Sequence, residues 1–410
     1  MLAGRRPQRR SGRSDPGLPP PPTITAAARR AEATLALVST PGRVAALDAA
    51  DALSVGLDVM VFSDNVSVPH EIALKEMAAA LGRLVMGPDC GTAVVDGIGL
   101  GFSNVVRPGP VGLVAASGTG AQQLLALLDG ADVGVSHCLG VGGRDMSSDI
   151  GGRSTIVALD RLAAADTVST IVVISKPPAT DVAERVSRHA ASLPKPVVMS
   201  FLGAGRPDLT AAAAEVVKAI GSEWKEPRHW GQTVSGEPVL GSQPRGYLRG
   251  LFSGGTLCDE AMLIAADVLG LLSSNIPLPG HRRLDHDLTS NGHTFIDFGD
   301  DQLTVGRPHP MIDPTLRLER LARELDDVDC GVVLLDVVLG HGAHPDPAAG
   351  LAPLISASST PVVISLIGTR DDPQGLEATA SRLADAGAVV HASNAAAARE
   401  AVGRLARVPT

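Results

Sequence analysis

The chain has 410 residues, a formal net charge of −9 at pH 7 and only 2% aromatic residues. The length is sufficient for two or three domains, each with a complete hydrophobic core. The scarcity of aromatic side chains argues against single-strand nucleic-acid binding by base stacking, and the negative charge disfavours other polyanionic partners.

The cysteines and the apolar stretches limit the class of protein further. Cys90, Cys138, Cys258 and Cys330 are widely spaced and match no metal motif. They predict reduced core thiols in a cytoplasmic protein, and no metal site is predicted. No run of about 18 uncharged apolar residues occurs, so no membrane span is predicted. Residues 1–29 are predicted to be a disordered leader without a secretory signal, or an upstream extension from a misplaced start.

A partial α/β domain is predicted over residues 30–109, because short apolar strands alternate there with helical segments. No G-x-G-x-x-G follows its first strand, so a nicotinamide or flavin fingerprint is absent. The predicted strands are Thr34–Ser39, Leu57–Phe62 and Leu84–Met86, and the predicted helices are Arg43–Ser54 and Glu71–Leu81.

Two similar stretches follow at residues 110–222 and 247–408, with a linker predicted over residues 223–246. Each stretch has four apolar strands joined by helical segments in the same order, which predicts two doubly wound α/β domains. The predicted strands are Val111–Ala116, Val133–Leu139, Thr170–Ser175 and Pro196–Leu202 in the first stretch, and Leu248–Phe252, Thr294–Phe298, Gly331–Val338 and Pro361–Ile367 in the second.

Each stretch opens with a small-residue turn between its first strand and its first helix. A helix that begins at such a turn has unpaired backbone N–H groups and a partial positive charge, which favour phosphate or carboxylate. One such turn alone would more often be a plain helix cap, but the duplication predicts two anion-binding turns that face one ligand. The first turn consists of Ser117, Gly118, Thr119 and Gly120, and the second of Ser253, Gly254, Gly255 and Thr256.

Other candidate residues follow predicted strands, at the edge where open α/β sheets bind ligands. Gly143, Arg144, Lys176 and Asp300 are predicted to orient the substrate. The alternative for Arg144 is an ion pair with the adjacent Asp145, and the alternative for Lys176 is a solvated surface position. Asp300 belongs to an acidic turn whose spacing does not enforce a metal site.

Arg307, His309 and His341 are the predicted catalytic residues. The guanidinium of Arg307 has the fork geometry for bidentate contact with a carboxylate. His309 lies between two prolines, so it is either a functional group on a stiff segment or part of a structural turn. His341 follows a predicted strand, and its alternative is an exposed loop histidine.

Several motifs resemble those of succinyl-CoA synthetase and its NDP-forming acyl-CoA ligase relatives. The motifs similar to the α-subunit are Gly87–Gly91, Arg107–Gly112 and Ser117–Thr119, and the second repeat is similar to the C-terminal domain of the β-subunit. The run Thr304–Thr315 and six shorter motifs resemble the FdrA family more specifically. The resemblance covers most of the chain. It implies an incomplete Rossmann-like CoA-binding-type domain followed by two flavodoxin-like succinyl-CoA-synthetase-type parallel-sheet domains.

The FdrA resemblance also implies a function. FdrA proteins are commonly labelled acyl-CoA synthetases, and some are subunits of oxamate carbamoyltransferase, which acts in anaerobic allantoin breakdown beside a carbamate kinase. Typical members have on the order of a hundred further N-terminal residues, so the resemblance implies that this chain begins partway through the CoA-binding-type domain. It implies further subunits in a hetero-oligomeric complex, and coenzyme A is the one cofactor that it leaves open.

The ligases of this superfamily pass phosphate through a histidine in a glycine-rich loop after the last strand of the α-subunit. The corresponding loop here, Phe201–Asp208, contains no histidine, and the nearest one upstream is His189. The ATP-grasp region and the phosphate loop G-x-x-x-x-G-K-[ST] are also absent from the sequence. We therefore expect neither the standard phosphohistidine route nor efficient use of ATP by this chain alone.

Three functions are compatible with these observations. The first is a subunit of a carbamoyltransferase that acts on carbamoyl phosphate and a small amide such as oxamate. The second is an acyl-CoA ligase subunit that works with a separate ATP-binding chain. The third is a non-catalytic scaffold that binds an anion or a partner. The first two are enzymes with a small anionic substrate, and none of the three requires nucleic acid or a membrane.

Overall fold

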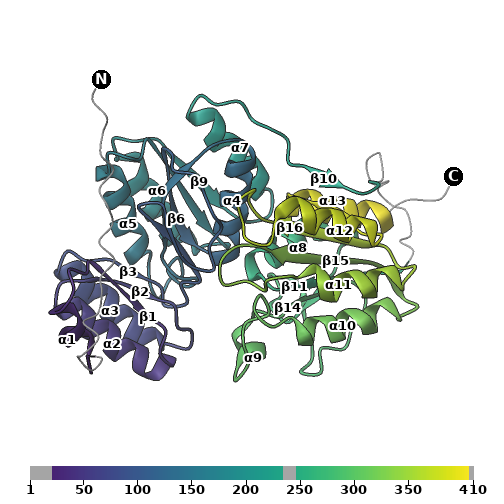
Figure 1. Cartoon of the computed structure of the whole chain (residues 1–410), viewed down its shortest axis with the longest axis horizontal. Coiled ribbons are helices and arrows are strands. Elements are labelled where there is room, and N and C mark those ends of the chain that lie inside the picture. The colour runs from purple at the N-terminus through teal and green to yellow at the C-terminus, as the bar shows by residue number, and fades with distance from the viewer. Residues whose placement is uncertain (1–20, 234–245, 406–410) are drawn as a thin grey trace.

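The computed structural model describes residues 21–233 and 246–405, which fold into three α/β units, each built on one sheet (Figure 1). The first unit is purple in Figure 1 and lies beside the blue second unit, and the green-to-yellow third unit packs against another side of the second. Most of the predicted leader and half of the predicted linker lie outside the described residues.

The first unit is a three-stranded parallel sheet with the order β1–β2–β3. Helix α2 buries Ala45, Ala49 and Ala52 at the four- and three-residue spacing of a helix face. Helix α1 lies within residues 1–29, which the sequence predicts to be disordered. For the residues of α1 this prediction is wrong. The elements are α1 (Ile24–Ala28), β1 (Leu35–Val38), α2 (Gly42–Ser54), β2 (Asp58–Val61), α3 (Val68–Ala80) and β3 (Val85–Met86).

The second unit has a six-stranded sheet with the order β5–β4–β7–β6–β8–β9. Its four parallel strands follow the flavodoxin-like order 2-1-3-4, and the antiparallel hairpin β4–β5 extends the sheet beyond β7. The strands are β4 (Thr92–Val95), β5 (Ile98–Gly101), β6 (Val111–Ala116), β7 (Val135–Gly140), β8 (Thr170–Ser175) and β9 (Val197–Phe201). The helices are α4 (Gly118–Gly130), α5 (Arg153–Ala164), α6 (Thr180–Ala191) and α7 (Leu209–Ala219).

The third unit has an eight-stranded sheet with the order β10–β17–β16–β15–β11–β14–β12–β13. Its main parallel strands, β11 and β14 to β17, follow the flavodoxin-like order 2-1-3-4-5. The strands are β10 (His229–Trp230), β11 (Tyr247–Phe252), β12 (Ser273–Ser274), β13 (Arg282–Arg283), β14 (Thr294–Asp297), β15 (Cys330–Val338), β16 (Val362–Ile367) and β17 (Val389–His391). The helices are α8 (Gly255–Leu269), α9 (Asp301–Thr304), α10 (Thr315–Leu325), α11 (Ala348–Ser356), α12 (Leu376–Asp385) and α13 (Asn394–Leu405).

The central strands read as continuous apolar runs because helices cover both faces of their sheets. In β6, Leu113 packs toward α4 and α7, whereas the next residue, Val114, packs toward α5 and α6. In β15, Leu334 packs toward α8 and α13, and Leu335 packs toward α10, α11 and α12. Successive side chains of a strand point to opposite faces, so all residues of β6 and all but Gly331 of β15 are buried.

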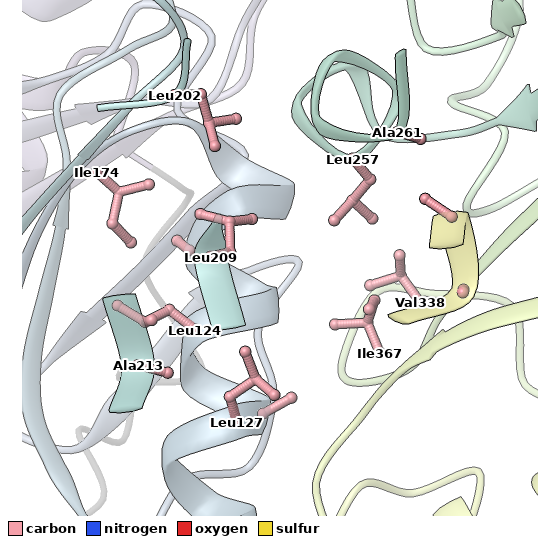
Figure 2. Close-up of a cluster of buried hydrophobic side chains, with 14 of the residues drawn as sticks. Leu124, Leu127, Ile174, Leu202, Leu209, Ala213, Leu257, Ala261, Val338 and Ile367 are labelled. Atoms are coloured by element: carbon pink, nitrogen blue, oxygen red, sulfur yellow. The ribbon is translucent and has the colours of Figure 1, made fainter. Parts of the chain in front are cut away.

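The second and third units share one hydrophobic cluster (Figure 2). Leu124 and Leu127 of α4 lie beside α7 on one side of the cluster, and α8 with the strand ends of the third unit lies on the other. The other labelled side chains are Ile174, Leu202, Leu209, Ala213, Leu257, Ala261, Val338 and Ile367. Burial of one such leucine contributes roughly 1.5–3 kcal/mol, so the shared cluster fixes the two units against each other.

Buried polar groups also join these two units. The carboxylate of Glu260 accepts the backbone N–H of Leu209 at 2.7 Å and the side-chain amide of Asn394 at 2.7 Å. The side chain of Gln123 accepts the backbone N–H of Asn394 and donates to the carbonyl of Ala392. These bonds connect α4 and α7 of the second unit to α8 and α13 of the third.

The architecture confirms the predicted α/β class, with a partial Rossmann-like unit followed by two flavodoxin-like parallel-sheet units. Two details differ from the predicted domain limits. The hairpin β4–β5 precedes residue 110 but pairs with β7 of the second unit, and β10 lies in the predicted linker but pairs with β17. Within the described residues, none of the helices is both long and apolar enough to cross a membrane.

Candidate functional site

The two small-residue turns lie opposite each other. Ser117 follows β6 and Ser253 follows β11, which are the first strands of the two flavodoxin-like sheets. The hydroxyl of Ser117 lies 2.6 Å from the hydroxyl of Thr256, and it also accepts the backbone N–H of Gly120 at 2.9 Å. The N-terminal ends of α4 and α8 therefore meet across the contact between the second and third units.

Glycine at the second turn is required by this close approach. A Cβ atom on Gly254 would lie 2.6–2.8 Å from the side chain of Thr119, which is closer than non-bonded atoms pack. A Cβ atom on Gly255 would lie 2.7 Å from Nζ of Lys176 and 2.8 Å from Oδ2 of Asp297. The start of α8 is thus surrounded by a hydroxyl, an ammonium group and a carboxyl group.

The two turns line one cavity of about 500 Å³, a volume typical of small-molecule sites. The predicted residues that line it are Ser117, Gly118, Thr119, Gly143, Lys176, Ser253, Gly254, Gly255, Thr256, Arg307 and His309. The first unit contributes the loops after β1 and β2. The structure thus places residues from all three units at one cavity.

Four predicted residues lie outside this lining, for different reasons. Gly120 supplies the N–H that Ser117 caps, and Asp300 caps the short helix α9 by accepting the N–H of Gln302. Arg144 turns toward the first unit, where it pairs with Glu71 at 2.9 Å. His341 is exposed, and its backbone pairs with Ser103.

The alternative pairing of Arg144 with Asp145 is wrong. Asp145 is fully buried and pairs instead with Lys75 of α3 at 2.7 Å. Lys75 also pairs with Glu71, so one buried network joins the first unit to the loop after β7. Lys75 lies in the middle of α3, and its position in the sequence does not distinguish it from a lysine on a solvated helix face.

Lys176 and Arg307 are the basic side chains among the described lining residues. Nζ of Lys176 lies 3.7 Å from Oδ2 of Asp259. Burial opposes its charged form, but the carboxylates of Asp259, Asp297 and Asp89 outweigh burial and raise the pKa of Lys176. Arg307 is exposed, and its guanidinium has no ion-pair partner among the described residues, which leaves it free to meet a ligand.

Several carboxyl groups line the same cavity, and the pKa values of two of them are raised well above the ordinary range of a carboxyl group. Burial, with the charge of Asp301, raises the pKa of Asp89 to about 7. Burial raises the pKa of Asp297 to about 7 against the opposing effect of Lys176. The sequence places Asp297 in an acidic turn and Asp89 in a turn with glycine and proline, and neither position indicates that the pKa of the side chain is raised. Among the described residues, no group of three or more His, Cys, Asp or Glu side chains is arranged to hold a metal ion.

Gln122 is a further lining residue that the sequence did not indicate. It lies in the first turn of α4 and is 1% exposed. Its side-chain nitrogen has no hydrogen-bond partner among the described residues. A buried amide without a partner is costly, so this group points to a ligand at the cavity.

His309 is a neutral hydrogen-bond donor in this arrangement. Burial and the charge of Arg317 lower its pKa to about 4. Nδ1 accepts the backbone N–H of Met311 at 3.2 Å, so the proton of the neutral ring lies on Nε2. That nitrogen lies beside Gly299 at the cavity, and its proton makes it a donor rather than a nucleophile.

Comparison with known proteins gives the family. The CoA-ligase family profile matches residues 251–403. The uncharacterized protein YahF of Escherichia coli (strain K12) is 40% identical over 386 residues, which cover 88% of this chain and 75% of YahF. The α-subunit of an ADP-forming succinate–CoA ligase from Methanothermobacter thermautotrophicus is 28% identical over 36% of this chain and 50% of that subunit.

Among solved structures, an ATP citrate lyase from Methanothrix soehngenii in complex with citrate and coenzyme A has 18% identity and a TM-score of 0.37. That match covers 49% of this chain and 37% of the lyase, and it is too weak to support an argument. The chain spans half of the archaeal α-subunit but three quarters of YahF. At 40% identity over that length, and with a matching profile over its third unit, the chain belongs to the CoA-ligase family that includes the succinyl-CoA synthetase α-subunit.

Proposed function

We propose that this chain is the substrate-binding subunit of a carbamoyltransferase complex that acts on carbamoyl phosphate and a small amide such as oxamate. The main support is the pair of helix N-termini at one cavity that has no histidine nucleophile among its described lining residues. Transfer of a carbamoyl group needs an anion site and stabilisation of a developing oxyanion, but no covalent intermediate.

The lining residues suggest a role for each part of the substrates. The N-termini of α4 and α8 would hold the phosphate of carbamoyl phosphate, where backbone N–H groups and helix dipoles favour negative charge. The guanidinium of Arg307 would orient the carboxylate of the amide substrate. The proton on Nε2 of His309 would hydrogen-bond to a carbonyl oxygen. The FdrA resemblance of the run Thr304–Thr315, which carries Arg307 and His309, is the second support for this proposal.

The test uses the complex as it is purified from the native host with its associated subunits. We expect phosphate release from carbamoyl phosphate that depends on oxamate. Arg307→Gln should raise the KM for oxamate at least tenfold, whereas Arg382→Gln, at an exposed ion pair far from the cavity lining, should leave it unchanged. Absence of oxamate-dependent phosphate release from the intact complex would contradict the proposal.

A second candidate is an acyl-CoA ligase subunit that works with a separate nucleotide-binding chain. Its support is the CoA-ligase profile over the third unit. The first unit fits coenzyme A poorly, because its contribution to the cavity, Ser39, Thr40, Pro41, Phe62, Ser63 and Asp64, includes no described lysine or arginine for the phosphates. An acid-labile, base-stable phosphohistidine formed with nucleotide in the complex would favour this candidate over the first.

A further inference from the structure

We propose that Asp297 acts as the acid of this site: its Oδ2 carries a proton and donates a hydrogen bond to a phosphate-type dianion bound between α4 and α8. The inference rests on the anion-binding part of the proposed function, and it adds a proton donor for the bound dianion to that site. The ligand class is a tetrahedral dianion, such as a phosphate ester or an acyl phosphate.

The backbone and one carboxyl oxygen of Asp297 are fixed by hydrogen bonds. The side chain of Asn275 accepts the N–H of Asp297 and donates to its carbonyl, both at 2.9 Å. Oδ1 accepts the N–H of Gly299 at 2.9 Å. Oδ2 has no hydrogen bond within the described chain, and Asp297 lines the cavity. The free oxygen is therefore held at the start of α8, where a Cβ atom of Gly255 would touch it.

The groups around Asp297 come from every element packed against it. They are Lys176 after β8, Asp259 and Cys258 on α8, Asp336 on β15 with its partner Arg317 on α10, and His309 at Gly299. Asp89 and Asp301 line the same cavity. His309 is neutral, and Asp336 is paired with Arg317 at 2.5 Å, so Lys176 is the main charge that favours ionised Asp297.

An anionic ligand changes this balance. A dianion at the start of α8 would lie beside ionised Asp297, and repulsion between like charges at a buried carboxylate is costly. Protonation removes the repulsion and supplies a donor, since a neutral carboxyl group has one O–H. Because burial already raises the pKa of Asp297 to about 7, the proton is available near neutral pH. Binding of a dianion should therefore take up a proton.

The size of the uptake follows from linkage. At pH 7.5 the unliganded Asp297 is mostly ionised, and the liganded one is protonated, so binding should take up roughly three quarters of a proton. Above pH 7 the affinity for a dianion should fall about tenfold for each pH unit. A site made only of backbone N–H groups and Lys176 would show neither effect.

The experiment is calorimetric titration of the full chain with sulfate, which has the charge and shape of phosphate but does not titrate near neutral pH. Enthalpies measured at pH 7.5 in two buffers with different heats of ionisation give the protons taken up. The variants are Asp297→Asn, Asp89→Asn, and the exposed Asp371→Asn as the matched control outside the cavity. Thermal unfolding checks that each variant is folded.

We expect proton uptake in the wild type, in Asp89→Asn and in Asp371→Asn, and uptake reduced at least fivefold in Asp297→Asn. Sulfate binding without proton uptake, or uptake that persists in Asp297→Asn, would overturn the role of Asp297 and leave the anion site intact. If Asp297→Asn does not fold, the pH series of Asp89→Asn decides the same point, because this variant lacks the other lining carboxyl group with a pKa of about 7. No sulfate binding at any pH would overturn both the anion site and this inference.

Discussion

The hydroxyl of Ser117 has two partners, the N–H of Gly120 at the start of α4 and the hydroxyl of Thr256 on the opposing turn. Ser117→Ala removes both contacts at a buried position. We expect the free energy of unfolding to fall by about 1 kcal/mol, the usual cost of a lost N-terminal cap, and the affinity for sulfate to fall as well. Ser117→Thr keeps a hydroxyl and should retain most of the stability and most of the affinity for sulfate. A Ser117→Ala protein with the stability and sulfate affinity of the wild type would contradict the assigned contacts.

His309 gives a prediction about protonation. Its pKa of about 4 means that the ring stays neutral through the physiological range, and the bond from Met311 fixes the proton on Nε2. Nitrogen NMR of labelled histidine should show one neutral tautomer from about pH 5.5 to about pH 8.5. Titration of this ring within that range, or a proton on Nδ1, would contradict its role as a donor.

At the residue scale, the sequence predicted the groups that follow strands or begin helices. Lys176, Thr119 and Thr256 could be placed because parallel strands end at one edge of their sheet. Asp297 and Gln122 could not, since their importance depends on burial and, for Gln122, on a missing hydrogen-bond partner. Asp89 could not, because its raised pKa depends on its surroundings in the folded chain. His341 follows a strand as expected, but it is exposed and does not line the cavity.

Helices α4 and α8 meet only because the second turn has no side chain at its closest point. Gly254→Ala would place a methyl group within 2.6 Å of Thr119 and push α8 away from α4. We expect a loss of about 1–3 kcal/mol in the free energy of unfolding, measured in urea, and a loss of sulfate binding. The matched control is Gly130→Ala in α4, where nothing lies within 4 Å and an alanine should be neutral or slightly stabilising. Equal stability of the two variants would contradict the close approach.

At the element scale, long apolar strands were predictable and short ones were not. The ranges predicted for β6 and β8 match the observed strands residue for residue, because strands buried on both faces form unbroken apolar runs. The hairpin β4–β5 was missed, although it has a recognisable signal. Its turn is Asp96-Gly97, with φ of 50° and 74°, which is the pair preferred in two-residue hairpins. Strands of two residues, such as β12 and β13, carry no period that a sequence could show.

The contact between the second and third units carries a pH dependence at Glu260. Burial raises the pKa of Glu260 to about 7 from an ordinary value of 4.5. A carboxyl group whose pKa is raised on folding stabilises the native state at low pH, and this contribution is lost as the pH rises from about 4.5 to about 7. A shift of this size corresponds to about 3 kcal/mol.

Glu260→Gln should therefore make the free energy of unfolding less dependent on pH between about pH 4.5 and about pH 7. Part of the slope will remain, because Asp297 and Asp89 titrate in the same range. Asp267→Asn, on the exposed side of the same helix, is the matched control and should keep the full slope. A Glu260→Gln protein with the slope of the wild type would show that Glu260 does not titrate on folding.

At the scale of the whole molecule, the order of three α/β units could be predicted from repeated strands and turns. Their mutual orientation could not, because it depends on pairs such as Ser117 with Thr256 and Glu260 with Leu209 that are distant in the sequence. The duplicated turns suggested that two helix starts face one ligand. The two helix starts meet because the second and third units share one hydrophobic cluster, whose residues are distant in the sequence.

The central claim is that the N-termini of α4 and α8 form one anion site. The most direct measurement is a crystal structure of the full chain with selenate, located by its anomalous scattering. The account predicts one selenate between the two turns, with oxygens about 3 Å from backbone N–H groups of both helices and from Oδ2 of Asp297. Selenate bound elsewhere, or bound by only one of the two helix starts, would contradict it.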